Sequence, residues 1–458
     1  MVASSLRVRV NRTPATLSQA GPTRRQFLKT AMLGSIAWAA CRLRAGTNAP
    51  VISSWDSSQA AADRWLERQR RKVSRRDFEL LRRAKEVLYR NILTEGELGK
   101  PLPWAPRRGI CPAPGKYRGV WNWDGSFHAL AVSRWDGELA REQLRIILDR
   151  QLPSGALINN IRASGLVRDR YGQPPVMPWV CALMHQRAPH NTFLASAYRQ
   201  FTRFEQHWWR DRGGEAEGLF HYYADLTHNA KEDNQAIRFE SGWDNSVRWD
   251  DGVELWTVDL NGYMVLFYRA MERMARWLGL PDEAQRWRAR REALAAKIND
   301  RLFNPRAGAY LDRRRDTGQF SEALSPASFL PLFAGVAQRA KARAMAKLAT
   351  DPARLFPGMP TVAYNHPRYE SGGYWRGPSW PETTYFAAKG LKFYGYKKTA
   401  EALRQNLLNW CAMNADALYE YYDSKSGKGL GEPQLACTGA LIIEFILNWD
   451  APDNLAGA

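Results

Sequence analysis

From Thr257 to Leu302 the sequence is TVDLNGYMVLFYRAMERMARWLGLPDEAQRWRARREALAAKINDRL, and this stretch decides the fold. Apolar residues recur at helical spacing up to Leu278 and again from Pro281, with only Gly279 and Leu280 between the two segments. A periodic segment that is interrupted by glycine and resumes at proline is typical of two helices joined by a tight turn. The stretch therefore predicts a helical hairpin, with helices over residues 257–278 and 281–302.

The same alternation of helix-like stretches and loops continues along the chain. Further helices are expected over residues 138–152, 192–211, 336–348, 380–394, 397–414 and 436–449, and one or two long charged helices over 59–95. Strand signals are few and short, and no Ser- or Pro-rich linker divides the chain after residue 60. The sequence therefore predicts an all-α fold in one large domain, a toroid of helical hairpins.

The charge of the chain would ordinarily suggest a polyanionic partner, since 66 basic and 46 acidic residues give a formal net charge of +20. Eight of those basic residues lie in residues 1–45, which hold no acid. In the remainder the arginines mostly alternate with acids and apolar residues on helix-like stretches, which is the pattern of solvated helix faces. We therefore expect no nucleic-acid partner.

The segment TRRQFLKTAMLGSIAWAA, which begins at Thr23, resembles a twin-arginine export signal. Arg24 and Arg25 precede an apolar run that is too short to span a bilayer, and Ala37 and Ala39 form an A-x-A cleavage pattern. The resemblance implies export by the Tat machinery and a periplasmic or secreted product with no stable membrane anchor. Cys41 faintly suggests lipidation, but Trp38 stands where a lipoprotein signal has an aliphatic residue.

The remaining cysteines indicate neither a metal site nor a cofactor. Cys111, Cys181, Cys411 and Cys437 are widely spaced, with no C-x-x-C pair and no histidine at zinc-ligand spacing. We therefore expect no metal, and leave disulfides open.

The loops between the predicted helices combine Gly and Pro with aromatic, acidic and amide residues. They are PGKYRGVWNWDGSFHALA from Pro114, QLPSGALINNI from Gln151, GQPPVMPWV from Gly172, ESGWDNS from Glu240, GYWRGPSWPETTYFAAKGL from Gly373, and LYEYYDSKSGKGLGEPQLACTGAL from Leu418. Aromatic rings stack on the apolar face of a sugar, while carboxylates, amides and guanidinium groups bind its hydroxyls. The loops therefore favour a carbohydrate substrate.

Glycosidic cleavage needs two carboxyl groups, one protonated and one ionised. The loops offer several acids, namely Asp124, Glu240, Asp244, Asp250, Glu382, Glu420 and Glu432. Asp244 follows Trp243, whose ring can desolvate a carboxyl and raise its pKa, and Glu420 is flanked by tyrosines that can keep a carboxylate ionised. The residues alone do not exclude that both acids are surface or capping groups.

Five of these motifs, in this order, resemble those of the clan of helical toroid glycosidases that includes glycoside hydrolase family 63, the trehalases and the mannosylglycerate hydrolases. They are WNWDGSFH, GQPPV, ESGWDNS, GYWRGPSW and YEYYDSKSGKGLG, and the similarity covers residues 110–449. The resemblance implies an (α/α)6 toroid and an inverting mechanism with Asp244 as general acid and Glu420 as general base. Their carboxyls should then lie about 6.5–9.5 Å apart.

The resemblance, together with the aromatic and polar residues of these loops, also implies a set of candidate substrate-binding residues. They are Trp121, Trp123, Asp124, Asn160, Gln173, Glu240, Trp243, Asn245, Trp375, Arg376 and Trp380. Asn159 is an alternative to Asn160, and Glu240 is either a sugar ligand or a loop-fixing carboxylate. The sequence departs from the family at Gly125 and in SGALINN, and the LDRRRDTG segment is expected to be an exposed basic turn.

We therefore interpret residues 1–45 as an export signal, 46–100 as an N-terminal linker with leading helices, and 101–450 as the catalytic domain. The expected function is inverting hydrolysis of a small or terminal α-linked glucoside or mannoside, trehalose-like or glycosylglycerate-like. The alternatives are a toroid polysaccharide lyase or sugar epimerase, and a sugar-binding protein without catalysis.

Overall fold

The computed structural model describes residues 55–94, 101–223, 230–252 and 254–455. The chain divides into a unit of residues 1–52, outside the described residues, and a unit of residues 53–458, which contains every described residue. The predicted export signal therefore lies outside the described residues.

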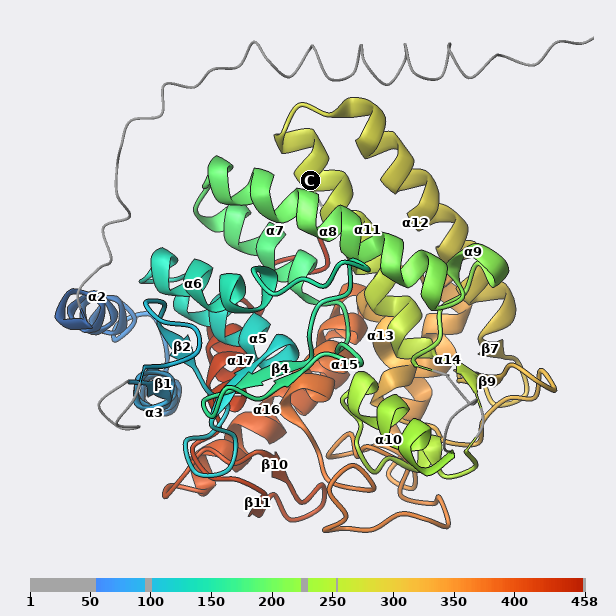
Figure 1. Cartoon of the computed structure of the whole chain (residues 1–458). Coiled ribbons are helices and arrows are strands. Elements are labelled where there is room, and N and C mark those ends of the chain that lie inside the picture. The colour runs from blue at the N-terminus through green and yellow to red at the C-terminus, as the bar shows by residue number, and fades with distance from the viewer. Residues whose placement is uncertain (1–54, 95–100, 224–229, 253, 456–458) are drawn as a thin grey trace, which may run out of the picture. The chain divides into compact units, whose positions relative to one another are not determined.

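Six helices pack against one another in a closed ring within the described residues (Figure 1). In chain order they are α5 (Asn122–Val132), α7 (Met177–Arg187), α11 (Val258–Trp277), α13 (Leu330–Phe333), α15 (Pro381–Phe393) and α17 (Ala436–Leu447). Each packs against the next, and α17 packs against α5, which closes the ring.

A second set of helices covers this ring. It consists of α3 (Arg75–Arg90), α6 (Gly137–Leu148), α8 (Asn191–Asp211), α12 (Pro281–Arg301), α14 (Arg339–Thr350) and α16 (Lys397–Met413). Helices α6, α8, α12 and α16 each pack on the inner helix that precedes them, whereas α3 packs on α17 from the other end of the chain. The predicted toroid of hairpins is therefore present, and α3 belongs to it.

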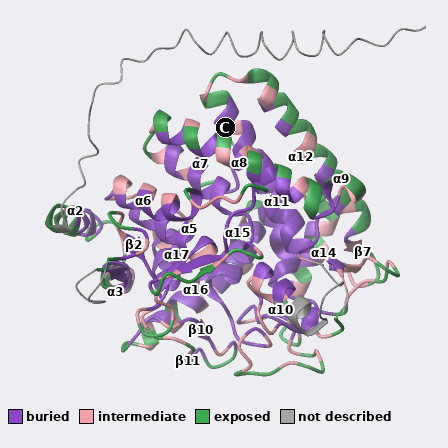
Figure 2. Ribbon diagram, in the orientation of Figure 1, coloured by how far each residue is buried: buried purple, intermediate pink, exposed green. Residues whose placement is uncertain are grey.

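The hairpin of α11 and α12 shows how the sequence forms these pairs. Gly279 ends α11 with a φ of 72°, a left-handed conformation that glycine adopts without strain, and Pro281 begins α12. Almost every residue of α11 is buried, whereas α12 buries only a stripe that includes Trp287, Leu294 and Ile298. Figure 2 shows the same contrast around the ring, with inner helices buried and the outer surface of α12 exposed.

The structure differs from the expected pattern at three inner helices. We expected loops over residues 114–131 and 172–180, but α5 begins at Asn122 and α7 at Met177, and α13 was not expected at all. These helices are buried on nearly all sides, so they lack the polar face that makes helical periodicity visible.

Short antiparallel strands occupy the connections, in five small sheets within the described residues. The strands are β1 (Ile92–Leu93), β2 (Gly109–Ile110), β3 (Gly119–Trp121), β4 (Asn160–Arg162), β5 (Val167–Arg168), β6 (Leu255–Trp256), β7 (Phe303–Asn304), β8 (Ala309–Tyr310), β9 (Arg313–Arg314), β10 (Tyr421–Tyr422) and β11 (Gly429–Leu430). The sheet β3-β4-β5 pairs Trp121 with Asn160, and the hairpin β10-β11 pairs Tyr421 with Leu430. The first pairing joins motifs that are distant in sequence, whereas the second lies within the motif that carries Glu420.

The candidate motifs share one position relative to the ring, because each lies at the start of an inner helix or in the connection that leads to it. WNWD leads into α5, GQPPV into α7 and YWRGPSW into α15. ESGWDNS, which carries Asp244 and is called the acid loop, leads toward α11. YEYYDSKSGKGLG, which carries Glu420 and is called the base loop, leads toward α17. None of the described helices combines the length and apolar character needed to cross a bilayer.

Candidate active site

The predicted motifs line one cavity of about 460 Å3. Among the candidate residues, those that line it are Trp121, Trp123, Asp124, Gln173, Asp244, Trp375, Trp380 and Glu420. They come from five separate segments of the chain. The ring of helices therefore brings both proposed catalytic acids to the same cavity.

Asp244 lies in the loop between α10 (Ala230–Ser241) and the short helix η1 (Val247–Trp249). Gly242 begins this loop with a φ of 75°, and Trp243 is buried beside the acid. No described residue donates a hydrogen bond to the Asp244 carboxyl. Burial, reinforced by the charge of Glu420, raises the pKa of Asp244 to about 7, so this carboxyl retains a proton near neutral pH.

Glu420 lies just before β10, and its carboxylate accepts three hydrogen bonds. The hydroxyls of Tyr117 and Tyr374 donate to Oε1 at 3.0 and 3.2 Å, and the backbone N–H of Glu432 donates to Oε2 at 3.0 Å. Burial raises the pKa of Glu420, but these donors oppose that effect because they stabilise the charged form. The two acids therefore differ in their hydrogen bonding, since donors stabilise the charged form of Glu420 and no described donor does so for Asp244.

Two backbone features hold the surroundings of Glu420. Tyr374 has a φ of 62°, in the left-handed region that a bulky residue rarely adopts, and this conformation accompanies the contact of its hydroxyl with Glu420. Gly431 has a φ of 73°, and a Cβ there would lie 2.7 Å from Glu420 Oε2 and 2.5 Å from the Tyr421 ring. Only glycine fits beneath the carboxylate at this position.

A stack of aromatic rings forms one wall of the cavity. The rings of Trp375 and Trp380 are nearly parallel with centroids 3.8 Å apart, and Tyr421 stacks on Trp380 at 4.9 Å. The ring of Trp243, which does not line the cavity, packs on that of Trp375 with centroids 4.8 Å apart. These rings offer a rigid apolar surface of the kind that contacts a sugar face.

The residues contributed by α5 and its neighbours form another part of the lining. The backbone N–H of Trp123 donates to Gln173 Oε1 at 2.8 Å, which joins the WNWD and QPP motifs. Asp124 is in the first turn of α5, and burial raises its pKa to about 7.

Three cations line the same cavity without a carboxylate partner among the described residues. Lys116 is exposed, and Arg162 and Arg168 are half-buried on the β4-β5 hairpin. The guanidinium of Arg162 lies 4.4 Å from the centre of the Trp121 ring, and that of Arg168 lies 4.9 Å from the Phe239 ring. The charge of Arg168 acts to lower the pKa of Asp244, and that of Lys116 acts to lower the pKa of Glu420, so these cations lie within electrostatic reach of the two proposed catalytic carboxyls.

Five of the candidate substrate-binding residues do not line the cavity, namely Asn160, Glu240, Trp243, Asn245 and Arg376. Asn160 donates to Asn159 Oδ1 at 2.7 Å, and Asn159 is the one that reaches the cavity. Asn245 accepts from the Trp375 N–H at 2.9 Å and donates to the Gly373 carbonyl at 3.0 Å. These side chains shape the loops around the cavity.

Glu240 and Arg376 are both held in ion pairs. Glu240 is fully buried, and its carboxylate binds the Arg212 guanidinium at 2.9 and 3.1 Å and the backbone N–H of Tyr223. Burial opposes ionisation of Glu240, but Arg212 lowers its pKa overall, which corresponds to the loop-fixing alternative. Arg376 pairs with Asp250 at 2.9 and 3.0 Å, so the carboxylate of Asp250 is also held in an ion pair.

A fully buried arginine also anchors the segment that follows Asp244. Arg248, in η1, binds Asp259 at the start of α11 and Asp312 in the segment before β9, with distances of 2.7–3.0 Å. Asp312 Oδ1 also accepts the Val258 N–H at 2.8 Å. This network connects the loop of Asp244 to the ring.

Sequence reasoning missed several residues of the lining, including Tyr117, Tyr374 and the three cations. Tyr117 and Tyr374 lie inside motifs that the sequence singled out, so their position beside Trp121 and Trp375 was an available signal. Arg162 and Arg168 reach the cavity because β4 pairs with β3 and β5 pairs with β4, which no local pattern indicates.

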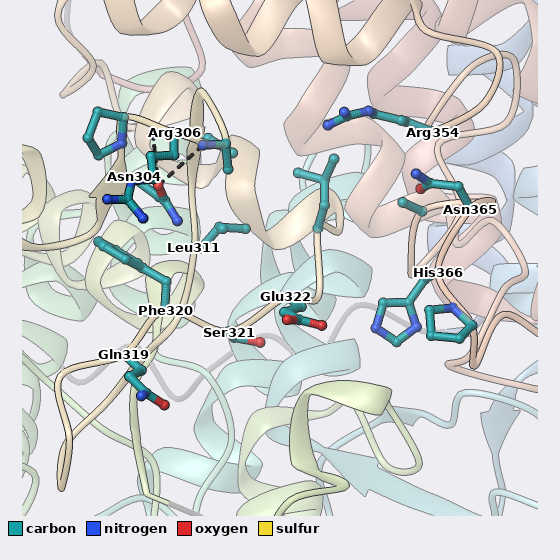
Figure 3. Close-up of a pocket in the computed structure, with 16 residues that line it drawn as sticks. Asn304, Arg306, Leu311, Gln319, Phe320, Ser321, Glu322, Arg354, Asn365 and His366 are labelled. Atoms are coloured by element: carbon teal, nitrogen blue, oxygen red, sulfur yellow. Dashed lines mark hydrogen bonds between the residues drawn. The ribbon is translucent and has the colours of Figure 1, made fainter.

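A second and larger cavity, of about 910 Å3, lies elsewhere in the described residues (Figure 3). Asn304 and Phe320 lie on one side of it and Asn365 and His366 on the other, with Glu322 between them. It contains one carboxyl, so it lacks the pair that glycosidic cleavage needs. The described residues contain no cluster of His, Cys, Asp and Glu that could hold a metal ion.

Comparison with known proteins agrees with this geometry. Residues 117–438 match the family model described as the mannosylglycerate hydrolase MGH1-like glycoside hydrolase domain. The mannosylglycerate hydrolase of Rubrobacter radiotolerans is 25% identical over 417 residues, which cover 73% of this chain and 92% of that protein.

Solved structures show the same fold. The GH63 mannosylglycerate hydrolase of Thermus thermophilus, in complex with Tris, aligns with a TM-score of 0.68 at 22% identity, over 80% of this chain and 99% of that one. The neutral trehalase of Saccharomyces cerevisiae aligns with a TM-score of 0.61 at 16% identity, over 76% and 74%. The predicted (α/α)6 toroid is confirmed, and the chain belongs to the MGH1-like family of glycoside hydrolases.

Proposed function

We propose that this chain hydrolyses an α-glycoside whose aglycone is small and carries a carboxylate, such as mannosylglycerate or glucosylglycerate, with inversion at the anomeric carbon. The observation that carries the proposal is the contrast between two carboxyls in one cavity. Asp244 receives no hydrogen bond from the described residues and has a pKa of about 7, whereas Glu420 accepts three. One is suited to give a proton and the other to take one.

In this mechanism Asp244 gives its proton to the glycosidic oxygen while the bond from that oxygen to the anomeric carbon breaks. Glu420 takes a proton from a water that attacks the anomeric carbon from the opposite face, so the anomeric configuration inverts. Tyr117 and Tyr374 hold the Glu420 carboxylate toward the cavity. The products are the free sugar and the aglycone alcohol.

The charges of the lining support an anionic aglycone. Lys116, Arg162 and Arg168 have no carboxylate partner in the described part of the chain, and arginine binds carboxylates in forked hydrogen bonds. A neutral aglycone would leave these cations without a partner. The match to mannosylglycerate hydrolases over most of this chain agrees with a glycerate-like group.

The decisive experiment assays mannosylglycerate, glucosylglycerate, trehalose and methyl glycosides with the wild type and with Asp244→Asn and Glu420→Gln. Each variant should lose nearly all activity, whereas Glu322→Gln, in the second cavity, serves as a matched control and should keep it. Full activity in either catalytic variant would contradict the mechanism. Proton NMR of the first-formed anomer tests inversion separately.

The aglycone is tested with Arg168→Gln. Its KM for a glycosylglycerate should rise about tenfold or more, because a charge-assisted bond is lost, while its KM for a methyl glycoside stays the same. Equal effects on both substrates would contradict an anionic aglycone. The rival activity, a polysaccharide lyase, predicts ultraviolet-absorbing unsaturated products from uronate polymers.

We also propose that the chain is exported by the twin-arginine route. The support is the sequence around Arg24 and Arg25, followed by an apolar run and an A-x-A pattern. In a host with this route the wild type should appear in the periplasm or the medium, and a variant with both arginines changed to lysine should stay in the cytoplasm. Equal distribution of the two proteins would contradict the proposal.

A further inference from the structure

The cavity contains a third deeply buried carboxyl that the mechanism does not use. Glu382 lies in the first turn of α15, two residues after Trp380, and only 3% of its surface is exposed. It lines the cavity, and its Oε2 has no hydrogen-bond partner among the described residues. A buried polar atom without a partner is rare in folded proteins, and a bound ligand commonly explains one.

The surroundings of Glu382 do not explain its presence in structural terms. The charged groups that act on it are the carboxylates of Asp124 and Glu420, and no described cation pairs with it. Its other titratable neighbours are the Cys437 thiol on α17, which forms a hydrogen bond with it, and Tyr263 on α11. A carboxyl in such a place costs free energy, and an apolar side chain of similar size would fill the space without that cost.

Because Glu382 is buried at the inner end of the cavity, we can infer which part of a substrate would reach it. Lys116 is exposed and Arg162 and Arg168 are half-buried, so they mark the open side of the cavity, whereas Glu382 is buried and lies near Asp124. A substrate that enters with its terminal sugar first places that sugar at the deep end and its aglycone near the cations.

We propose that Glu382 binds the terminal sugar, through hydrogen bonds from its carboxyl to a ring hydroxyl, next to the hydroxyl bound by Asp124. This inference rests on the proposed function, since it concerns the sugar that Asp244 and Glu420 act on. Two carboxyls that face adjacent hydroxyls fix the sugar's orientation, and an epimer at either carbon loses one of the contacts. Glu382 is thus a specificity-determining residue for the glycon.

The protonation of Glu382 provides a signature of this role. Burial raises its pKa to about 8, and the nearby charges of Asp124 and Glu420 act in the same direction, whereas the bond with the Cys437 thiol opposes them. Below this pH the protonated carboxyl both donates and accepts a hydrogen bond. As the pH rises through about 8 the donor is lost and a charge appears, so sugar affinity should fall.

The test compares Glu382→Gln, Glu382→Leu and the wild type, in full-length protein. One measurement is the steady-state KM and kcat for the best substrate, and the other is calorimetric binding of the free sugars mannose and glucose. In Glu382→Leu the affinity for the free sugar and kcat/KM should fall about tenfold or more, because the sugar hydroxyl loses its partner. Glu382→Gln keeps a donor and an acceptor and should bind nearly as the wild type at pH 6.

The pH series separates a sugar-binding role from a structural one. Asp124 and Asp244, whose pKa values are about 7, titrate in both proteins, so wild-type affinity should fall by more than that of Glu382→Gln as the pH rises through about 8. The unfolding temperature of both variants should match or exceed that of the wild type. Wild-type affinity for the sugar in Glu382→Leu would overturn the inference, as would parallel pH profiles in the wild type and Glu382→Gln.

The two proposals fail in different ways. A wild type that hydrolyses none of the glycosides contradicts the proposed function, and the calorimetric binding still tests Glu382. A wild type that hydrolyses its substrate, with Glu382→Leu equal to it, leaves the proposed function standing and rejects the inference.

Discussion

Asp244 and Glu420 differ in what surrounds them, and this difference sets the pH range in which the site works. In the proposed mechanism Asp244 must be protonated, so we expect activity to be lost as the pH rises through its pKa of about 7. Glu420 must be ionised, so activity is also lost as the pH falls through its own pKa, which lies above the ordinary glutamate value. We expect a bell-shaped profile of kcat/KM whose optimum lies below pH 7.

The profile is measured on a glycosylglycerate and on a neutral methyl glycoside, so that titration of the substrate is separated from that of the enzyme. Because the charge of Glu420 acts on Asp244, the two carboxyls titrate as a coupled pair. The acidic and basic limbs of the profile therefore report pKa values of the pair. An optimum above pH 8 would contradict the assignment of Asp244 as the acid.

Gly431 gives a second prediction at the scale of one residue. A Cβ at this position would meet Glu420 Oε2 and the Tyr421 ring, and the φ of 73° adds strain for any other residue. We expect Gly431→Ala to lower kcat about tenfold or more, since displacing a catalytic group by about 1 Å can cost a hundredfold. Gly372→Ala, where a Cβ meets no atom within 4 Å, is the control and should behave as the wild type. Unchanged kcat in Gly431→Ala would show that the base loop tolerates displacement.

At the scale of elements, the acid loop depends on the buried pairing of Arg248 with Asp259 and Asp312. Replacing Arg248 by Met leaves two buried carboxylates without a cation, and removing one partner of a buried ion pair typically costs about 3–5 kcal/mol. We expect a fall of this size in the free energy of unfolding, measured by urea denaturation, together with loss of activity.

The control for Arg248 is Asp316→Asn, which removes an exposed pair with Arg314 and should leave the urea midpoint unchanged. A midpoint equal to the wild type in Arg248→Met would mean that the network does not support the acid loop.

The helices also show which elements could be predicted from the sequence and which could not. The pair 257–278 and 281–302 was predicted almost to the residue, because α12 exposes one face and Gly279 and Pro281 mark the turn. Helices α5 and α7 were missed since they are surrounded by protein, and their sequences combine Trp, Gly and Pro as loops do.

The site follows the same logic. Residues inside recognisable motifs, such as Asp124, Asp244 and Glu420, were predicted and lie in the cavity lining. Glu240 and Arg376 lie in the same motifs but are held in ion pairs with Arg212 and Asp250, partners that only the folded chain brings within reach. The motifs therefore predicted which loops surround the cavity. Which of their side chains line it depends on contacts that form only in the folded chain.

At the scale of the whole molecule, the cysteines predict how the protein responds to reducing agents. Cys111, Cys181, Cys411 and Cys437 are all buried, and none of the four is joined to another by a disulfide. Burial raises the pKa of the Cys181 and Cys411 thiols to about 12. Since the thiolate is the reactive form, we expect these four thiols not to react with a thiol reagent in the native protein and to react after unfolding. Cys41 lies outside the described residues.

Thiol counting in native buffer and in urea checks this, with intact mass under non-reducing conditions as the control. The unfolding temperature should be the same with and without dithiothreitol. A disulfide between any two of these four cysteines would contradict the prediction.

The closing contact of the ring, where α17 meets both α3 and α5, joins helices from opposite ends of the described chain. The loop that carries Glu420 immediately precedes α17. During synthesis the proposed base and the helix that closes the ring therefore emerge after every other wall of the cavity. Contacts between such distant segments form only once the later one is available. A nascent chain on the ribosome would hold the proposed acid without its base, and hydrolysis would begin only when the last helix docks.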